Sequence, residues 1–242
     1  MDDQKQKKSA MEVYAIPLSI VIAGAIMAGA LYYSNLKVKT QEAVIDTVQK
    51  VAEGSVVKMR PVTAEDHILG NPSAEVIIVE YSDTECPFCK QFHNTLRRVM
   101  NDYGKDGKVA WVYRHFPIDS LHSKARKEAE ATECANDLGG PAKFWEYINL
   151  LYDTTQSNNS LDLAKLPEFA KAIGLDVKAF NACLSSGKFA AKVEADYQDA
   201  IGAGGQGTPN SIIITKDGTK TNVPGAQPYE SLKSIIDAIL NK

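Results

Sequence analysis

The sequence predicts an α/β domain with a large helical insertion, and one transmembrane helix in front of it. A short β-branched run at 76–79 has the length of a buried strand and leads through a turn into helical spacing after Cys86. From Ser120 to about Ala203 the pattern is almost wholly helical. Residues 13–33 form an uncharged run of 21 residues, and a helix of that length, about 31 Å, is long enough to cross a bilayer.

The composition excludes several classes of protein. Of the 242 residues, 44% are hydrophobic and 24% are charged, which are values of an ordinary globular chain. The net charge of −3 gives no basic footprint, so we expect no nucleic-acid partner. Four cysteines are too few for a disulfide scaffold, but their even number suits an oxidising compartment. No segment indicates self-association, so we expect a monomer.

The N-terminal segment predicts where the protein lies. Tyr14 and Tyr32 stand at the two ends of the apolar run, where interfacial aromatic residues are common, and lysines are slightly more numerous before it than after it. This predicts a single-pass protein of the cell membrane with a cytoplasmic N-terminus and an extracytoplasmic domain. The alternative is a cleaved signal peptide with Ala28-Gly29-Ala30 as its cleavage site. The predicted order is a cytoplasmic tail at 1–12, a transmembrane anchor at 13–33, a juxtamembrane stalk or partner-binding helix at 34–60, and the domain at 61–242.

The motif Cys86-Pro87-Phe88-Cys89 carries the chemistry that the sequence indicates. Pro87 fits the first position of a helix, where its missing N–H costs nothing. The Cys86 sulfur is then exposed at the positive end of a helix dipole, which favours a thiolate. Cys89 lies one turn later and can close a disulfide back onto Cys86. A reactive thiol with a resolving thiol in reach suits thiol–disulfide exchange.

Two other interpretations of this motif are weaker. Half of a zinc site would need further ligands, and Cys134 and Cys183 stand alone and far apart. We therefore expect no metal and no cofactor. An inert hairpin disulfide is the other alternative, but the strand before the motif and the helix after it argue against it.

The rest of the chain alternates strand and helix signals. A second central strand is expected at 109–116, and residues 211–215 and 221–223 form a hairpin around the turn Asp217-Gly218. An amphipathic helix at 229–240 ends the chain. Residues 60–75 contain turn signals and no predicted strand. Within the insertion, glycine and proline separate helical segments at 120–138, 141–154, 162–173, 176–184 and 187–203.

These features together resemble a known family. A strand, a C-P-x-C motif at a helix start, an acid at Glu80 six residues before the first cysteine, and Gly207-Thr208-Pro209 before a β run are similar to the thioredoxin fold. The long helical insertion, about 120–203, resembles the DsbA-type branch of the thioredoxin superfamily. The resemblance covers Pro61 to the C-terminus and implies a thioredoxin fold with an inserted helical subdomain.

The resemblance implies roles for individual residues. Cys86 would be the nucleophile that forms a mixed disulfide, and Cys89 would resolve it. Glu80 would be a buried acid that exchanges a proton with Cys89, unless it is merely an exposed acid at a strand end. Thr208 and Pro209 would form the cis-proline loop beside Cys86 and offer backbone hydrogen bonds to an extended substrate, unless Pro209 only starts a strand.

Phe88 departs from the pattern of DsbA oxidases, which commonly have histidine at this place. Phenylalanine can neither donate a hydrogen bond nor carry a charge. Pro87 and Phe88 would thus tune Cys86 toward a less depressed pKa and a less oxidising couple.

The remaining cysteines and histidines are secondary candidates. Cys134 and Cys183 lie in different helical segments and are either two unrelated buried thiols or a structural disulfide, which some DsbA-like proteins carry. His93 is expected to be a packing or surface residue, and His115 is given no role. His122 opens the insertion and is a candidate for contact with substrate or for tuning of the thiolate.

The resemblance also implies a function and its partners. The protein would be a membrane-anchored DsbA-like thiol–disulfide oxidoreductase that acts on unfolded or exported proteins with thiols. A DsbB-like or quinone-linked membrane oxidase would re-oxidise it. A reductase or isomerase of the same fold is one alternative. A chaperone-like module that binds polypeptides without using its thiols is another.

Overall fold

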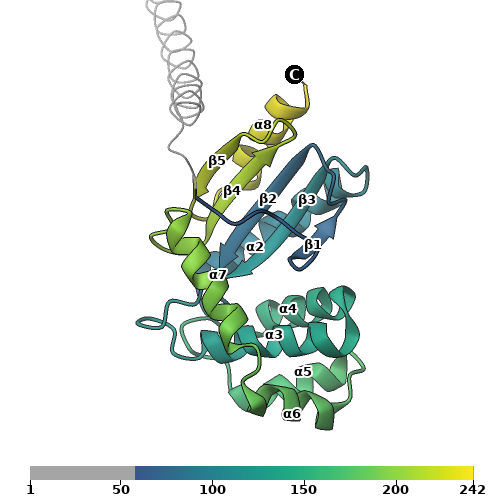
Figure 1. Cartoon of the computed structure of the whole chain (residues 1–242), viewed down its shortest axis with the longest axis vertical. Helices are drawn as coiled ribbons and strands as arrows, with labels where there is room; N and C mark the ends of the chain where they lie inside the picture. Colours follow the sequence, from purple (N-terminus) through teal and green to yellow (C-terminus); the bar gives the residue numbers. More distant parts are fainter. Residues whose placement is uncertain (1–57, 242) are drawn as a thin grey trace, which may run out of the picture. The chain divides into compact units, whose positions relative to one another are not determined.

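The computed structural model describes residues 58–241, and in this part the predicted α/β fold with a helical insertion is confirmed. A five-stranded sheet has the order β1-β3-β2-β4-β5, and only β2 and β3 run parallel (Figure 1). The strands are β1 (His67–Gly70), β2 (Val76–Ser82), β3 (Val109–His115), β4 (Asn210–Thr215) and β5 (Lys220–Pro224).

Helices cover both faces of the sheet. The helices α2 (Pro87–Val99) and α8 (Tyr229–Leu240) pack on one face, together with part of α4 (Pro141–Thr154). The opposite face packs against α7 (Ala190–Gly202), which lies in front of the sheet in Figure 1. Because side chains alternate along a strand, Val76, Ile78 and Glu80 point toward α2, whereas Val79 and Tyr81 point toward α7.

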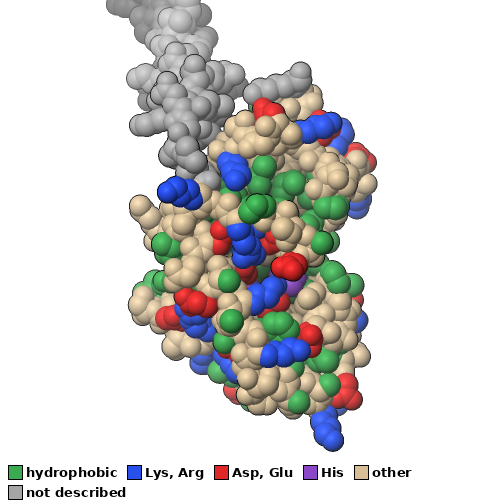
Figure 2. Space-filling view, in the orientation of Figure 1, with side chains coloured by type: hydrophobic (Ala, Val, Ile, Leu, Met, Phe, Trp, Pro, Cys, Tyr) green, Lys and Arg blue, Asp and Glu red, His purple; other side chains and the backbone are tan. Residues whose placement is uncertain are grey.

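The helical insertion has a core of its own. It contains α3 (Ala125–Gly139), α4, a 3₁₀ turn (Leu163–Lys165), α5 (Leu166–Ala172) and α6 (Val177–Ser186). Tyr147 and Phe180 stack at its centre, with ring centroids 5.6 Å apart. In Figure 1 these helices form a layer at one end of the sheet. On the face seen in Figure 2, acidic and basic side chains are interspersed rather than separated by sign.

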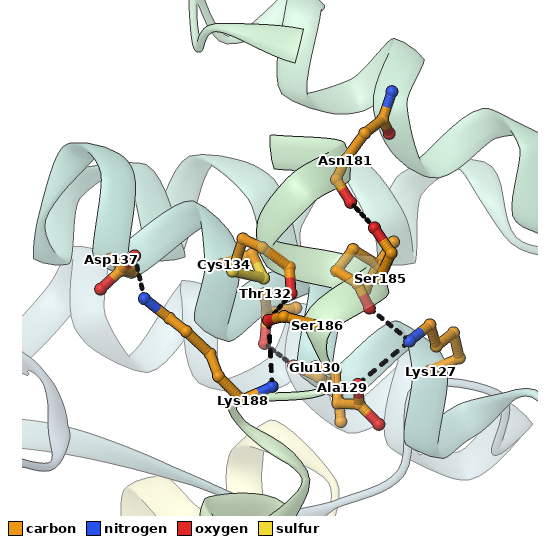
Figure 3. Close-up of a disulfide and its surroundings, with 12 residues drawn as sticks. Lys127, Ala129, Glu130, Thr132, Cys134, Asp137, Asn181, Ser185, Ser186 and Lys188 are labelled. Carbon is orange, nitrogen blue, oxygen red and sulfur yellow. Dashed lines mark hydrogen bonds and ion pairs between the residues drawn. A yellow bond between two sulfur atoms is a disulfide. The ribbon is translucent and has the colours of Figure 1, made fainter. Parts of the chain in front are cut away.

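A disulfide joins Cys134 of α3 to Cys183 of α6 (Figure 3). The two Cα atoms are 5.9 Å apart, and 49 residues of sequence separate the cysteines. Both are buried in the core of the insertion. Beside the bridge, Lys188 and Asp137 form an ion pair of 2.6 Å at the surface. The bridge thus closes the insertion into a loop that includes α4 and α5.

We expect a Cys134→Ala, Cys183→Ala variant to lower the free energy of unfolding by about 2–4 kcal/mol, because the unfolded chain regains the freedom of a long loop. Urea denaturation of the air-oxidised proteins measures this free energy of unfolding. A Lys188→Ala variant is the matched control: it removes the neighbouring half-exposed ion pair and should cost less than about 1 kcal/mol. Equal midpoints for the wild type and the double variant would contradict this.

Several element boundaries differ from the sequence prediction. Strand β1 was not predicted, because it has only four residues and ends in a glycine with a φ of 100°. It pairs with β3 as an edge strand. The first insertion helix begins at Ala125 rather than at residue 120, since residues 117–124 form a loop. Met59 and Arg60, assigned from sequence to the stalk, belong to the domain, because Met59 is buried under α7 and Arg60 binds Asp196 of that helix.

Within residues 58–241, no helix has both the length and the apolar character needed to cross a bilayer. The predicted transmembrane segment at 13–33 and most of the predicted stalk lie outside the described residues.

Candidate active site

The Cys86–Cys89 pair lies at the start of α2, directly behind the turn that follows β2. Cys86 is the N-cap residue with extended backbone angles, and Pro87 occupies the first turn. Both cysteines are free thiols. Cys86 is only 5% exposed, so the expectation of an exposed nucleophile is wrong. The Thr208 carbonyl oxygen lies 3.5 Å from its sulfur, and it is the side chain of Phe88, 61% exposed, that points to solvent.

The environment of Cys86 favours its thiolate. Hydrogen bonds with the Cys89 thiol, with the Thr208 side chain, and with the backbone N–H groups of Cys89 and Phe88 outweigh burial and lower the pKa of Cys86 to about 6. Free N–H groups and the dipole at the N-terminus of α2 act in the same direction. Near neutral pH the Cys86 sulfur is therefore largely ionised.

The environment of Cys89 has the opposite effect. Complete burial raises the pKa of the Cys89 thiol well above its ordinary value, and the neighbouring charges of Cys86 and Glu80 add to this. A single backbone donor, the Asp83 N–H, lies 3.4 Å from the Cys89 sulfur. The site thus holds one thiolate and one thiol, which is the arrangement required for nucleophilic attack followed by resolution.

Glu80 is completely buried on the α2 side of β2, so it is not an exposed acid at a strand end. Burial raises its pKa to about 8, although hydrogen bonds from Ser82 and Trp111 oppose the shift. The Ser82 hydroxyl lies 2.8 Å from Oε1, and the Trp111 indole N–H donates to Oε2 at 2.9 Å. A carboxyl group with this pKa can donate and accept a proton close to neutral pH.

The loop before β4 forms the other wall of the site. The Thr208–Pro209 peptide bond is cis, and its position places the Thr208 carbonyl beside Cys86. A surface pocket of about 440 Å³ lies next to this loop. It is lined by residues 206–210 and by Asn222, Pro224 and Gly225 at the end of β5. The predicted site residues of two distant segments are thus brought together.

Sequence reasoning missed Asp83, which contacts Cys89 through its N–H and His122 through its carboxylate. Asp83 Oδ2 lies 2.9 Å from His122 Nδ1, and both side chains are buried. His122, a weaker candidate from sequence, is therefore attached to the active-site turn. His93 packs in the interior, with Nε2 2.7 Å from Asn149 Oδ1.

Sequence reasoning also missed a pair of buried carboxyl groups next to the motif. Glu85 directly precedes Cys86, and Glu128 of α3 lies beside it; both are completely buried. Leu161 N–H donates to Glu85, whereas neither oxygen of Glu128 has a hydrogen-bond partner within residues 58–241. Burial, reinforced by the Glu85 carboxyl, raises the pKa of Glu128 to about 9.

We expect a Glu128→Gln variant to gain stability relative to the wild type as the pH rises. The folded state keeps a proton on Glu128 that the unfolded chain releases near pH 4.5, so the wild type loses stability between that pH and about 9. Thermal unfolding measures the Tm of the variant minus that of the wild type. We expect this difference to be at least about 3 °C larger at pH 8.5 than at pH 5. Glu130→Gln, at a partly buried neighbour on α3 that pairs with Lys127, is the control. A difference in Tm that does not change with pH would contradict the shift.

A second buried cluster raises the question of a metal. His67, His115 and Glu133 each bring a ligand atom within 4.8 Å of the others. The ammonium group of Lys192 lies among them, 2.8 Å from Glu133 Oε1 and 3.0 Å from His67 Nε2. A lysine therefore fills the place that a cation would take, and we assign no metal to the described part of the chain.

Comparisons with known sequences identify the family of the domain. A family model described as thioredoxin matches residues 62–238. Among curated proteins, the Na(+)/H(+) antiporter NhaA 1 of Salinispora arenicola is 33% identical over 164 residues, which are 67% of this chain and 24% of the antiporter. NhaA 1 of Mycolicibacterium gilvum is 29% identical over 199 residues, 81% of this chain and 30% of the antiporter. The chain thus spans only about a quarter to a third of the length of these relatives.

Comparisons with solved structures agree on the architecture. BdbD from Bacillus subtilis in its oxidised form has a TM-score of 0.66 at 22% identity, covering 78% of this chain and all of that chain. Alpha-DsbA1 from Wolbachia pipientis has a TM-score of 0.64 at 24% identity, covering 74% and 93%. DsbA2 from Pseudomonas aeruginosa has a TM-score of 0.61 at 26% identity, covering 74% and 97%.

These likenesses fit the geometry of the site, in which a strand, a C-P-x-C turn, a helix and a cis-proline loop meet around two cysteines. The domain has a thioredoxin-like fold with a helical insertion, and its fold is similar to that of the two DsbA structures. The chain belongs to the thioredoxin family.

Proposed function

We propose that this protein is a DsbA-like thiol–disulfide oxidoreductase that exchanges disulfides with exported polypeptides through Cys86 and Cys89. One observation carries the proposal: two free thiols meet at the start of α2, Cys86 beside the Thr208 loop and Cys89 buried against the Asp83 N–H. These surroundings lower the pKa of Cys86 and raise that of Cys89, which favours a thiolate at Cys86 and a thiol at Cys89. A stable thiolate is both the better leaving group and the form that attacks a disulfide. Glu80 lies behind the pair with a pKa suited to proton exchange.

The exchange proceeds in two displacements. In the oxidised protein, a substrate thiolate attacks Cys86 Sγ; the Cys86–Cys89 bond breaks, and a bond between the substrate and Cys86 forms. The electron pair stays on Cys89, which takes a proton from the Glu80 carboxyl group. A second substrate thiolate then attacks the substrate sulfur of the mixed disulfide and releases Cys86 as a thiolate. The substrate loses two electrons, and the protein becomes the dithiol.

The reverse direction, as a reductase or isomerase, is favoured by Phe88. Its side chain is exposed and offers no hydrogen bond to Cys86. The Cys86 pKa of about 6 lies between the value of about 7 in thioredoxin and about 3.5 in DsbA. A thiolate that is stabilised less than in DsbA makes the disulfide a weaker oxidant.

The surface around Cys86 suits an extended polypeptide. Phe88, two residues after Cys86, is exposed, and Thr208, whose carbonyl lies beside the sulfur, lines the adjoining pocket. Leu121, 66% exposed, is a second large apolar side chain, on the loop that His122 attaches to the active-site turn. Exposed apolar side chains and backbone groups bind unfolded segments with little dependence on sequence.

The proposal extends to a location and to partners, which the sequence and the disulfide support. Residues 13–33 would tether the domain to the cell membrane, with the N-terminus in the cytoplasm and the thiols outside. The Cys134–Cys183 bridge supports an oxidising compartment. A DsbB-like or quinone-linked oxidase in the same membrane would restore the Cys86–Cys89 disulfide, and the protein would act as a monomer. The intact mass distinguishes an anchor from a signal peptide, since cleavage would remove the residues up to Ala30.

A redox titration of the full chain in detergent, against graded glutathione buffers, tests the proposal. Maleimide mass shifts count the free thiols at each point. We expect two thiols to titrate together while Cys134 and Cys183 stay blocked. A midpoint near about −120 mV would make the protein a disulfide donor, and one near about −270 mV a reductase. A chain in which no pair titrates would rule out thiol–disulfide exchange.

A further inference from the structure

Asp83 has a central place in the turn between β2 and α2. Its backbone N–H donates to the Cys89 sulfur at 3.4 Å, and its carbonyl oxygen accepts from the Tyr152 hydroxyl at 3.3 Å. The residue is buried, three positions before Cys86. The peptide group of Asp83 therefore supplies a backbone hydrogen bond to the sulfur that must gain and lose charge.

The side chain of Asp83 is held from two directions. Oδ1 accepts from the Glu85 N–H at 2.8 Å, which fixes it to the start of α2. Oδ2 accepts from the Ile118 N–H at 2.7 Å and lies 2.9 Å from His122 Nδ1. Ile118 and His122 belong to the loop that enters the insertion, and the same loop is closed by a hydrogen bond from the His122 N–H to the Ile118 carbonyl. The His122 ring is buried against the carboxylate.

The chemistry of the site gives this arrangement a use. When a substrate thiolate attacks Cys86 Sγ, the sulfur–sulfur bond breaks and Cys89 carries the negative charge until it receives a proton. Cys89 is completely buried, so no bulk solvent stabilises that charge. In a site without water, an N–H dipole that is held pointing at the charged sulfur stabilises the developing charge far more than an N–H dipole that is free to move.

We infer that Asp83 and His122 are a positioning pair that holds the Asp83 N–H on the Cys89 sulfur while Cys89 leaves or attacks. The inference rests on the proposed disulfide exchange and adds a residue of the insertion loop to its machinery. His122 acts through Asp83 and does not touch either sulfur in this arrangement. It donates from Nδ1 to Oδ2, and the carboxylate in turn fixes the backbone of the turn.

The experiment follows the opening of the Cys86–Cys89 disulfide by reduced glutathione in a single turnover. We expect His122→Ala to slow the opening by about tenfold, because the donor to the charged sulfur is no longer held in place. His122→Asn should recover most of the rate, since its amide nitrogen occupies the place of Nδ1. His122→Gln should not, because its amide nitrogen lies where Nε2 was. Ser123→Ala, next in sequence and exposed, should leave the rate unchanged.

A second readout separates positioning from a general loss of structure. Alkylation of reduced Cys86 by iodoacetamide places no charge on Cys89, so its rate should stay within about twofold in all the variants. An equal fall in alkylation and in disulfide opening would overturn the inference, as would equal rates for the Asn and Gln variants or an unchanged rate in His122→Ala. The Asn and Gln comparison holds even if the alanine variant does not fold. A wild-type disulfide that glutathione cannot open would instead refute the proposed function.

Discussion

A Cys86→Ser variant is expected to lose disulfide exchange by at least about a thousandfold, because the nucleophilic sulfur is removed and no other group can replace it. Cys89→Ser should behave differently. Cys86 would still attack a substrate disulfide, since it stays at the start of α2 and remains in contact with the Thr208 carbonyl. The mixed disulfide would then accumulate, because the resolving thiol is missing. Non-reducing electrophoresis after mixing with a disulfide-containing polypeptide would reveal the trapped complex.

The control for these variants is the second pair of cysteines. Cys134 and Cys183 are already bridged to each other, so they cannot stand in for the active pair. If the Cys86→Ser, Cys89→Ser double variant kept full biological activity, thiol exchange would not be the function. The domain would then act as a polypeptide-binding module of the same fold. Mixed disulfides that form equally well with Cys86→Ser would show that Cys89 is the nucleophile.

The local parts of the site could be predicted from the sequence because their signals lie close together in the chain. The strand at 76–82, the motif at 86–89 and the helix after it form one continuous pattern, and Glu80 takes its place from the alternation along the strand. The loop at Thr208 was also predicted, although more than a hundred residues separate it from Cys86, because Gly207-Thr208-Pro209 before a β run resembles the cis-proline loop of the thioredoxin superfamily.

The contacts across the insertion could not be predicted, because no spacing in the sequence records them. Asp83 and His122 are 39 residues apart, and Glu85 and Glu128 are 43 residues apart. His122 lies on the loop before α3 and Glu128 on α3 itself, so each pair meets only where this part of the chain packs beside the active-site turn. The burial of Cys86 has the same origin: a helix start is open by itself, and the Thr208 loop covers it only in the folded domain.

A Glu80→Gln variant should open and resolve the disulfide about 10 to 100 times more slowly at pH 7, because the buried carboxyl group that Ser82 and Trp111 hold in place can no longer transfer a proton. Glutamine keeps the shape of the protonated acid. Its oxygen can accept from the Trp111 N–H, and its amide can donate to the Ser82 hydroxyl. A loss of rate therefore reports proton transfer rather than packing. Single-turnover kinetics with glutathione measure it, with Glu75→Gln, exposed just before the same strand, as the control.

The pH dependence and the stability of Glu80→Gln make the test sharper. Opening of the disulfide needs the protonated acid, so the wild-type rate constant for attack by the thiolate should fall as the pH passes about 8, and the variant should lack this step. The folded pKa of Glu80 lies above that of the unfolded chain, so its contribution to stability is complete below about pH 4.5 and lost as the pH rises through about 8. Glutamine has no such loss. The variant should therefore be slower and yet more stable than the wild type at pH 8, a combination that damage to the fold would not produce; a variant that is slower and less stable would mean that Glu80 acts through packing alone.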